Sequence, residues 1–189
     1  MSEPAEPPLQ GPPRATKRVE SLVLVNTGDG KGKTTAALGT AFRAAGHGWR
    51  VCVIQFMKDE RWKTGEQQAA AKLGIDWWTL GDGFTWDSSN MEETEAKARA
   101  AWKAAADVIA GGEYRLVVLD EITYPVGWGW IDEEEVVSAI RSRPAHVSII
   151  ATGRQATPGL IEIADTASEV LNLKHAFDSG VAMLKGIDF

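Results

Sequence analysis

The chain has 189 residues, a formal net charge of −6 and a single cysteine. This length suits one domain that buries a substantial core without disulfides. The acidic balance argues against a broad nucleic-acid surface, which needs clustered positive charge. The sequence lacks an apolar run of about 18 residues and a secretion signal. We therefore expect a cytoplasmic protein that has neither a nucleic-acid partner nor a membrane partner.

The first 18 residues differ in composition from the rest. They carry prolines at positions 4, 7, 8, 12 and 13 and almost no large apolar side chains. Such a segment buries too little surface to offset the entropy of ordering. We therefore predict a disordered, proline-rich tail over residues 1–18 and a single domain over residues 19–189.

The first predicted strand, 22–26, leads into a glycine-rich loop and then an alanine-rich helix that ends near residues 45–48. The loop reads Thr27, Gly28, Asp29, Gly30, Lys31, Gly32, Lys33, Thr34 and Thr35. Its glycines permit turns where a Cβ would clash, so successive N–H groups and the helix N-terminus are able to face phosphate oxygens. Lys33 supplies a mobile positive charge and Thr34 a hydroxyl for magnesium. This context predicts a nucleoside triphosphate site.

The loop departs from the common G-x-x-x-x-G-K-[ST] pattern at one position. Thr27 takes the place of the first glycine, and Gly28 follows one residue later. The alternative interpretation is a glycine-rich turn that binds nothing. The ending Gly32-Lys33-Thr34 between a strand and a helix makes that alternative the minority one.

The second predicted strand, 51–56, is apolar and ends in polar side chains. Gln55 and Lys58 fall at its carboxyl end, the edge where open parallel sheets bind ligands. Both are therefore site candidates, although a solvated surface lysine is an equal alternative for Lys58. Cys52 lies inside this strand, where we expect a small core side chain rather than a catalytic thiol.

A polar loop at residues 81–90 holds two large aromatic residues, Phe84 and Trp86. Either each ring fills an edge of the core, or both form one wall of a pocket for a flat or apolar ligand. Their spacing alone slightly favours the core.

A second chemical motif ends the apolar strand at 116–121, where Asp120 and Glu121 are adjacent. In phosphate-loop proteins such an aspartate lies near magnesium, and the acid after it is free to polarise or position a reactant. Apolar strands that end in aspartate are common. The motif is a weak indication alone and becomes a strong one together with the glycine-rich loop.

Arg154 follows the strand predicted at 147–151, where a guanidinium is able to bind phosphate or carboxylate oxygens in a bidentate way. The other predicted elements are helices at 65–73, 89–110, 132–141 and 158–164, and strands at 75–80 and 169–173. This alternation predicts an α/β protein with a three-layer, phosphate-loop NTPase-like fold around a mostly parallel central sheet.

From about Leu22 to the C-terminus, the chain resembles the phosphate-loop type of ATP:corrinoid adenosyltransferase, a family of vitamin B12 synthesis and salvage. The resemblance rests on Thr-Gly-Asp-Gly-Lys-Gly-Lys-Thr-Thr-Ala-Ala at 27–37, Gln-Phe-Met-Lys at 55–58, Gly-Phe-Thr-Trp at 83–86, Val-Leu-Asp-Glu-Ile-Thr-Tyr at 118–124, Thr-Gly-Arg at 152–154, Lys-His-Ala-Phe-Asp-Ser-Gly at 174–180 and a final Gly-Ile-Asp-Phe. Thr27 is itself the family's form of the loop.

The resemblance implies that ATP donates its 5′-deoxyadenosyl group to the cobalt of a corrinoid reduced to Co(I), and that inorganic triphosphate leaves. It implies ATP contacts from residues 28–35, Lys58 and Arg154, and magnesium, or manganese, near Thr34, Asp120 and Glu121. Catalytic roles fall to Lys33, Thr34, Phe84 and Trp86. Apolar groups beneath the corrin ring ease cobalt reduction, so the resemblance shifts our interpretation of Phe84 and Trp86 to a pocket wall.

The resemblance also implies a homodimer and an electron-donating reductase, which we expect to be a flavoprotein. No side chain stands out as a nucleophile, which fits attack by cobalt itself. The three histidines are isolated in the sequence; His175 falls in a family motif, and we expect a structural role for it. The proline-rich start departs from the helical N-terminal segment of the family.

Two other functions use the same loop. One is phosphoryl transfer by a kinase of the nucleoside-kinase type, and the other is a nucleotide-dependent switch with weak hydrolysis. A kinase needs a lid arginine cluster and an acceptor base, and a switch needs a γ-phosphate sensor; Arg154 alone establishes neither. The phosphorus product separates the three, because only adenosyl transfer leaves inorganic triphosphate.

Overall fold

The computed structural model describes residues 17–58, 64–81 and 91–188. In this part of the chain, six strands form one sheet in the order β3-β2-β4-β5-β1-β6, and every neighbouring pair is parallel. The strands are β1 (Val23–Thr27), β2 (Val51–Gln55), β3 (Asp76–Thr79), β4 (Leu116–Asp120), β5 (Ser148–Thr152) and β6 (Thr166–Glu169). All carboxyl ends of the strands therefore meet at one edge of the sheet.

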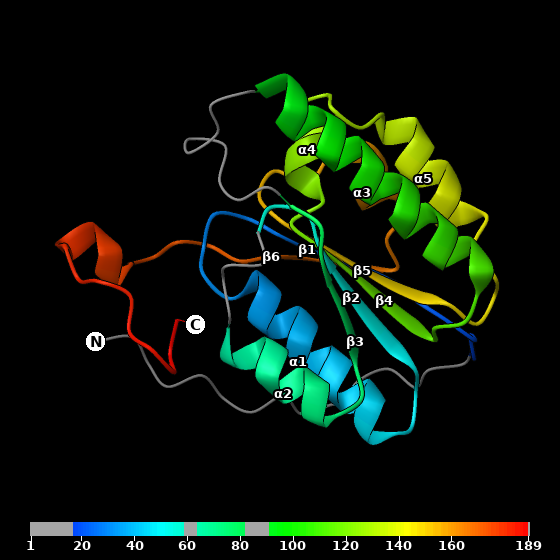
Figure 1. Cartoon of the computed structure of the whole chain (residues 1–189), viewed down its shortest axis with the longest axis horizontal. Coiled ribbons are helices and arrows are strands. Elements are labelled where there is room, and N and C mark those ends of the chain that lie inside the picture. Colours follow the sequence, from blue (N-terminus) through cyan, green and yellow to red (C-terminus); the bar gives the residue numbers. More distant parts are fainter. Residues whose placement is uncertain (1–16, 59–63, 82–90, 189) are drawn as a thin grey trace, which may run out of the picture.

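Helices cover both faces of this sheet (Figure 1). They are α1 (Lys33–Gly46), α2 (Gly65–Lys72), α3 (Met91–Gly111), α4 (Thr123–Gly127), α5 (Glu133–Arg141) and α6 (Pro158–Ile163), followed by the 3-10 helix η2 (Ala176–Ser179). In the described residues, no helix is both long and apolar enough to cross a membrane. The predicted three-layer α/β fold is confirmed.

The core consists of two apolar layers because side chains alternate along each strand. On one side, Val53 and Val118 pack with Leu38 of α1 in the first layer. On the other side, Ile54 and Leu119 belong to the layer that also contains buried residues of α3 and α5. Strands β2, β4 and β5 are buried along their whole length, which explains their continuous apolar sequences.

The last strand differs from the prediction. We predicted it at 169–173, but β6 ends at Glu169 and pairs in parallel with β1. All four of its side chains are exposed, so no apolar pattern marks it. The apolar residues that suggested the strand come after it and include Leu173, which is 91% exposed. The short helices α4 and η2 were also not predicted.

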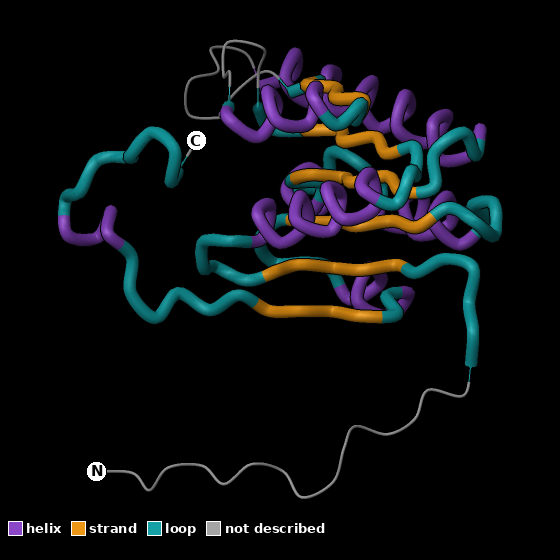
Figure 2. Tube along the Cα trace, turned by 90° about the horizontal axis from the view of Figure 1, so that it is seen from below, coloured by secondary structure: helices purple, strands orange, loops and turns teal. Residues whose placement is uncertain are grey.

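After β6 the chain runs past the carboxyl ends of the strands, and we refer to residues 170–188 as the C-terminal segment (Figure 2). Most of this segment is exposed. Its exposed large apolar residues are Leu171, Leu173, Phe177, Val181, Met183, Leu184 and Ile187.

The two-layer core gives a stability prediction. Ile150 is fully buried in the central strand β5, so Ile150→Ala should lower the free energy of unfolding by about 2–5 kcal/mol. Ile161 of α6 is 38% exposed and offers a matched control, with an expected cost below about 1 kcal/mol. Chemical denaturation of both variants checks this. Equal costs would contradict the assigned core.

Candidate active site

The glycine-rich loop lies where β1 ends and α1 begins, at the carboxyl edge of the sheet. A cleft of about 530 Å³ opens there. It is lined by Asp29, Gly30, Lys31, Gly32, Lys33, Thr34, Thr35, Lys58, Glu66, Glu121, Tyr124 and Arg154, and by Asn172, His175, Phe177, Asp178, Met183 and Asp188 of the C-terminal segment. The structure thus brings most of the predicted site residues into one cleft.

Two loop glycines serve the packing of the protein itself. A Cβ on Gly28 would lie 2.5 Å from the carbonyl oxygen of Val170, and one on Gly30 would lie 2.5 Å from that of Leu171. The Gly30 N–H donates to the Val170 carbonyl oxygen at 2.7 Å. The expectation that successive loop N–H groups face phosphate is therefore wrong at Gly30, because the C-terminal segment takes this donor.

Thr27, the unusual first residue of the loop, has a structural task. Its hydroxyl oxygen accepts a hydrogen bond of 2.9 Å from the N–H of Ala156. The same turn is held from the other side by Thr123, whose hydroxyl donates to the Arg154 carbonyl oxygen at 2.6 Å. Glycine at position 27 would remove the first of these bonds. The two threonines together fix the turn from which Arg154 reaches the cleft, where its Nε lies 3.9 Å from Asp29 Oδ1.

Lys33 lines the cleft, and its ammonium group donates to the Gly30 carbonyl oxygen at 2.7 Å. Burial lowers the pKa of Lys33, and the nearby Arg154 guanidinium lowers it further, while the carboxylates of the site act in the opposite direction. A cation held this way gains stability when an anion enters the cleft.

The Asp120 carboxylate is fully buried and is the centre of a hydrogen-bond network. Its Oδ1 accepts from the hydroxyls of Thr34 and Thr152, each at 2.8 Å. Its Oδ2 accepts from the Gln55 side-chain amide at 2.9 Å and lies 3.8 Å from Lys58 Nζ. These contacts join α1, β2, β4 and β5, and they fix the position of the Thr34 hydroxyl.

Glu121 has an unusual backbone and an unusual carboxyl group. Its φ of 65° is in the left-handed region, which side-chain-bearing residues seldom occupy. Its N–H donates to the Thr152 hydroxyl oxygen at 3.0 Å, whereas its buried Oε2 has no hydrogen-bond donor among the described residues. Burial raises the pKa of Glu121 to about 7, and the negative charge of Asp120 adds to this shift. The strain and the unpaired oxygen indicate a functional group.

The oxygen atoms at this point fit a hard divalent cation. Thr34 offers a hydroxyl, Asp120 a carboxylate and Glu121 a carboxyl oxygen that meets no donor in the described part of the chain, which are the ligand types that magnesium prefers. Within the described residues, no group of three or more His, Cys, Asp or Glu side chains is arranged to hold a metal ion by itself. Magnesium in proteins is commonly held by one or two carboxylates together with substrate phosphates and water.

The other candidates fall into different places. Lys58 borders the cleft with its side chain 22% exposed, so the interpretation as a freely solvated lysine is wrong. Cys52 is buried as expected, and burial raises its thiol pKa to about 12. Phe84 and Trp86 lie outside the described residues, and their roles stay predictions. Gly28 packs against the backbone of Val170 and does not line this cleft.

The sequence alone did not place the C-terminal segment at the site. Lys31 Nζ forms an ion pair of 2.9 Å with Asp188, and His175 Nδ1 accepts from the Phe177 N–H at the start of η2. This hydrogen bond gives His175 a structural role in addition to its place in the cleft. The motif at 174–180 was the available signal, but nothing in its composition connects it to the loop. Tyr124 also lines the cleft, although the sequence analysis did not predict it as a site residue.

A family model for ATP:corrinoid adenosyltransferase BtuR/CobO/CobP matches residues 19–189. The chain belongs to the ATP:corrinoid adenosyltransferase family. The corrinoid adenosyltransferase of Escherichia coli (strain K12) is 44% identical over 168 residues, which cover 89% of this chain and 85% of that protein. The corrinoid adenosyltransferase CobA of Salmonella typhimurium matches with the same identity and coverage. That of Pseudomonas aeruginosa is 41% identical over 170 residues, or 89% of this chain and 83% of that protein.

The resemblance inferred from the sequence motifs is thereby confirmed. As an adenosyltransferase of this family, the chain transfers the adenosyl group of ATP to a corrinoid. The phosphate loop and the Asp120 network belong to the matched region.

The raised pKa of Glu121 gives a pH prediction for the protein without nucleotide or divalent cation. Below about pH 4.5 the carboxyl is protonated in both the folded and unfolded states, so it contributes nothing to the pH dependence. Between 4.5 and 7 the unfolded state ionises first, which destabilises the fold progressively. Glu121→Gln should therefore gain stability over the wild type as the pH rises to 7, and this gain should then level off.

Thermal unfolding from pH 4.5 to 8 measures the difference in stability between Glu121→Gln and the wild type. Glu20→Gln, at an exposed position, is the control and should show no comparable trend. A stability difference between Glu121→Gln and the wild type that does not change with pH would contradict the raised pKa of Glu121.

Proposed function

We propose that adenosyl transfer takes place in the cleft, with the triphosphate of ATP on residues 28–35. The observation that carries this is the contact between Thr34 and the buried Asp120, beside Lys33 and the unpaired oxygen of Glu121. The Co(I) centre of the reduced corrinoid attacks C5′ of ATP. A cobalt–carbon bond forms, the C5′–oxygen bond breaks, and the triphosphate leaves with the electron pair.

The protein's main task is to stabilise charge on the leaving triphosphate. Lys31, Lys33, Lys58 and Arg154 all border the cleft and provide positive charge before the reaction begins. Such preorganised charge lowers the barrier because it requires no rearrangement when the bond breaks. The glycine-rich loop and the start of α1 add N–H groups, with the exception of Gly30.

We propose magnesium as the cofactor, with manganese as an alternative for the same ligands. Thr34, Asp120 and Glu121 would hold the ion, as their oxygen atoms suggest. When bound, the ion neutralises part of the charge on the triphosphate. The protein's contribution is to keep Thr34 oriented through Asp120, and Asp120 oriented through Thr152 and Gln55.

We further propose a homodimer, and the exposed apolar residues of the C-terminal segment support it, because such surface is costly in water. An external reductase, which we expect to be a flavoprotein, would supply the electron that converts Co(II) to Co(I). Phe84 and Trp86 would wall off the lower face of cobalt. The division into a 1–18 tail and a 19–189 domain, and the cytoplasmic location, also stay predictions.

Family membership favours adenosyl transfer over the kinase and switch alternatives. The direct test is an anaerobic reaction of ATP, magnesium and a corrinoid chemically reduced to Co(I). Equal amounts of adenosylated corrinoid and inorganic triphosphate are expected. ADP or orthophosphate as the phosphorus product would contradict the proposal.

Lys33→Ala should reduce triphosphate release by about 100-fold or more, because it removes a preorganised charge from the leaving group. The fold should remain, since Lys33 belongs to the cleft lining rather than to the apolar core. Lys103→Ala, at an exposed position on α3, is the control. Wild-type turnover in Lys33→Ala would refute the phosphate-loop assignment.

Asp120→Asn should shift the magnesium titration of activity to higher concentrations, because one formal charge leaves the site. The new amide also faces the Gln55 side-chain amide as donor against donor, so some loss of stability is expected. Asp132→Asn makes the same chemical change at the exposed N-cap of α5, where both residue types cap well. An unchanged titration in Asp120→Asn would remove Asp120 from the metal site.

A further inference from the structure

Three aromatic residues form a continuous group at the carboxyl edge of the sheet. Tyr124 is in α4, and Trp128 and Trp130 lie in the turn after it. The ring centroids of Tyr124 and Trp128 are 5.5 Å apart, and those of Trp128 and Trp130 are 4.7 Å apart with the rings tilted by 60°. These separations are within the range of favourable ring contacts. We refer to these three residues as the aromatic cluster.

The aromatic cluster is continuous with the active site. Tyr124 lines the cleft that also contains Lys33 and Glu121, and it contacts Trp128 on its other side. Because β1 and β4 are parallel, α4 begins at the same edge of the sheet as α1 (Figure 1). Burial raises the pKa of Tyr124, and the charge of Glu121 raises it further, so its ring stays neutral. An uncharged aromatic surface thus leads out of the cleft.

The exposed end of the cluster is held firmly and is open to approach. Trp128 is 45% exposed. Gly127 and Gly129 flank it, and a Cβ on either would meet no atom of the described residues within 4 Å. The turn is nevertheless fastened, because the N–H groups of Trp128 and Trp130 donate to the carbonyl oxygens of Tyr124 and Pro125, each at 2.9 Å. The exposure of Trp128 therefore belongs to an ordered, accessible surface.

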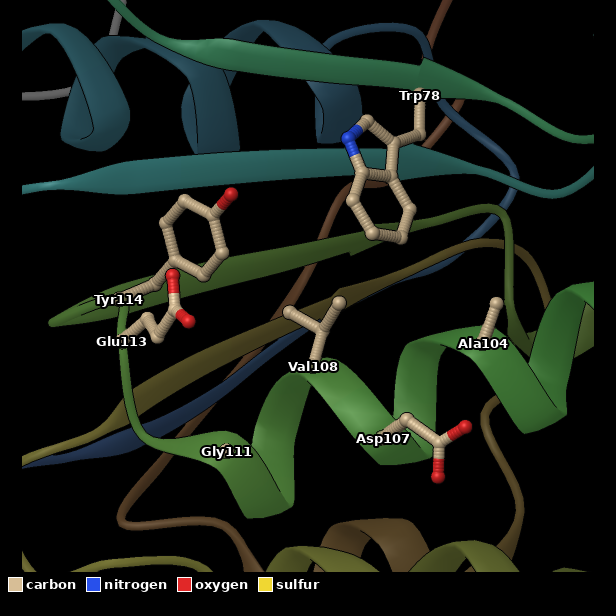
Figure 3. A pocket seen from close by; sticks show the side chains of 7 residues that line it. All are labelled: Trp78, Ala104, Asp107, Val108, Gly111, Glu113 and Tyr114. Atoms are coloured by element: carbon tan, nitrogen blue, oxygen red, sulfur yellow. The ribbon is translucent and has the colours of Figure 1, made fainter.

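A different aromatic hollow, of about 450 Å³, lies between β3 and α3 and includes Trp78 and Tyr114 (Figure 3). Its Tyr114 precedes β4, so this hollow reaches the opposite edge of the sheet from Asp120. It has no residue in common with the cleft. Of these two aromatic surfaces, only the aromatic cluster adjoins the cleft that contains Lys33 and Glu121.

We propose that the aromatic cluster is a docking wall for the corrin ring, a surface that stacks against the flat, largely apolar macrocycle. The inference rests on the proposed function, which requires the cobalt to reach C5′ of an ATP molecule whose triphosphate is on the loop. The corrinoid must then lie at the mouth of the cleft, where Tyr124 is shared between the cleft and the cluster. A planar ligand suits Trp128, because an indole buries a large flat area on stacking.

The test measures steady-state kinetics with cob(I)alamin generated by a chemical reductant. Trp128→Ala should raise the KM for the corrinoid by about 10-fold, the size of a lost stacking contact, and change the KM for ATP by less than about twofold. Trp128→Phe should retain most of the corrinoid affinity, whereas Trp128→Leu should not. Leu73→Ala removes an exposed apolar side chain after α2, 48% exposed, and serves as the control.

Three outcomes would overturn the docking wall. The first is an unchanged corrinoid KM in Trp128→Ala or, if that variant does not fold, in Trp128→Leu. The second is dissociation of an oligomer by light scattering, which assigns the cluster to a second copy of the chain. The third is normal turnover with chemically reduced corrinoid but slow turnover with a reductase, which assigns it to the electron donor. Failure of the proposed function is distinct, because the wild type would then release no triphosphate.

Discussion

The buried carboxylate of Asp120 is the interaction on which the active-site edge depends. A buried charge is tolerated only when hydrogen bonds replace the water it has lost. Here Thr34, Thr152 and Gln55 donate to it, and Lys58 lies nearby. Each donor comes from a different element, so loss of one would leave the carboxylate short of a donor and would remove the link between that element and β4. The requirement to satisfy Asp120 therefore positions the groups that surround it.

The shape of the glycine-rich loop depends on the protein as much as on its ligand. Gly28 and Gly30 leave room for the backbone of Val170 and Leu171, and Thr27 anchors the turn before Ala156. The ion pair of Lys31 with Asp188 adds a contact to the end of the same C-terminal segment. The turn at Ala156 thus explains why the loop carries Thr27 in place of the usual glycine. Close contact with the backbone of the C-terminal segment explains Gly28 and Gly30.

The sequence predicted the parts of the fold whose burial leaves a pattern. Strands β2, β4 and β5 are buried throughout and appear as apolar runs. The exposed β6 leaves no such pattern, and its position was predicted about three residues too late. In the site, the apolar strand that ends in Asp120 indicated, together with the glycine-rich loop, that this aspartate belongs to the same site as the loop. The left-handed backbone of Glu121 and the contacts of the C-terminal segment depend on tertiary packing, so no local pattern reveals them.

The positive charges of the cleft suit a polyanion although the chain as a whole is acidic. The net charge of −6 belongs to the whole surface, whereas Lys31, Lys33, Lys58 and Arg154 concentrate positive charge at one edge of the sheet. A phosphate loop of this kind holds a triphosphate whichever bond is later broken. Selection of the adenosyl acceptor must therefore come from the other side of the nucleotide. Aromatic and apolar residues from α4 and the C-terminal segment, among them Tyr124, Phe177 and Met183, line part of the same cleft, and the loop motif does not specify them.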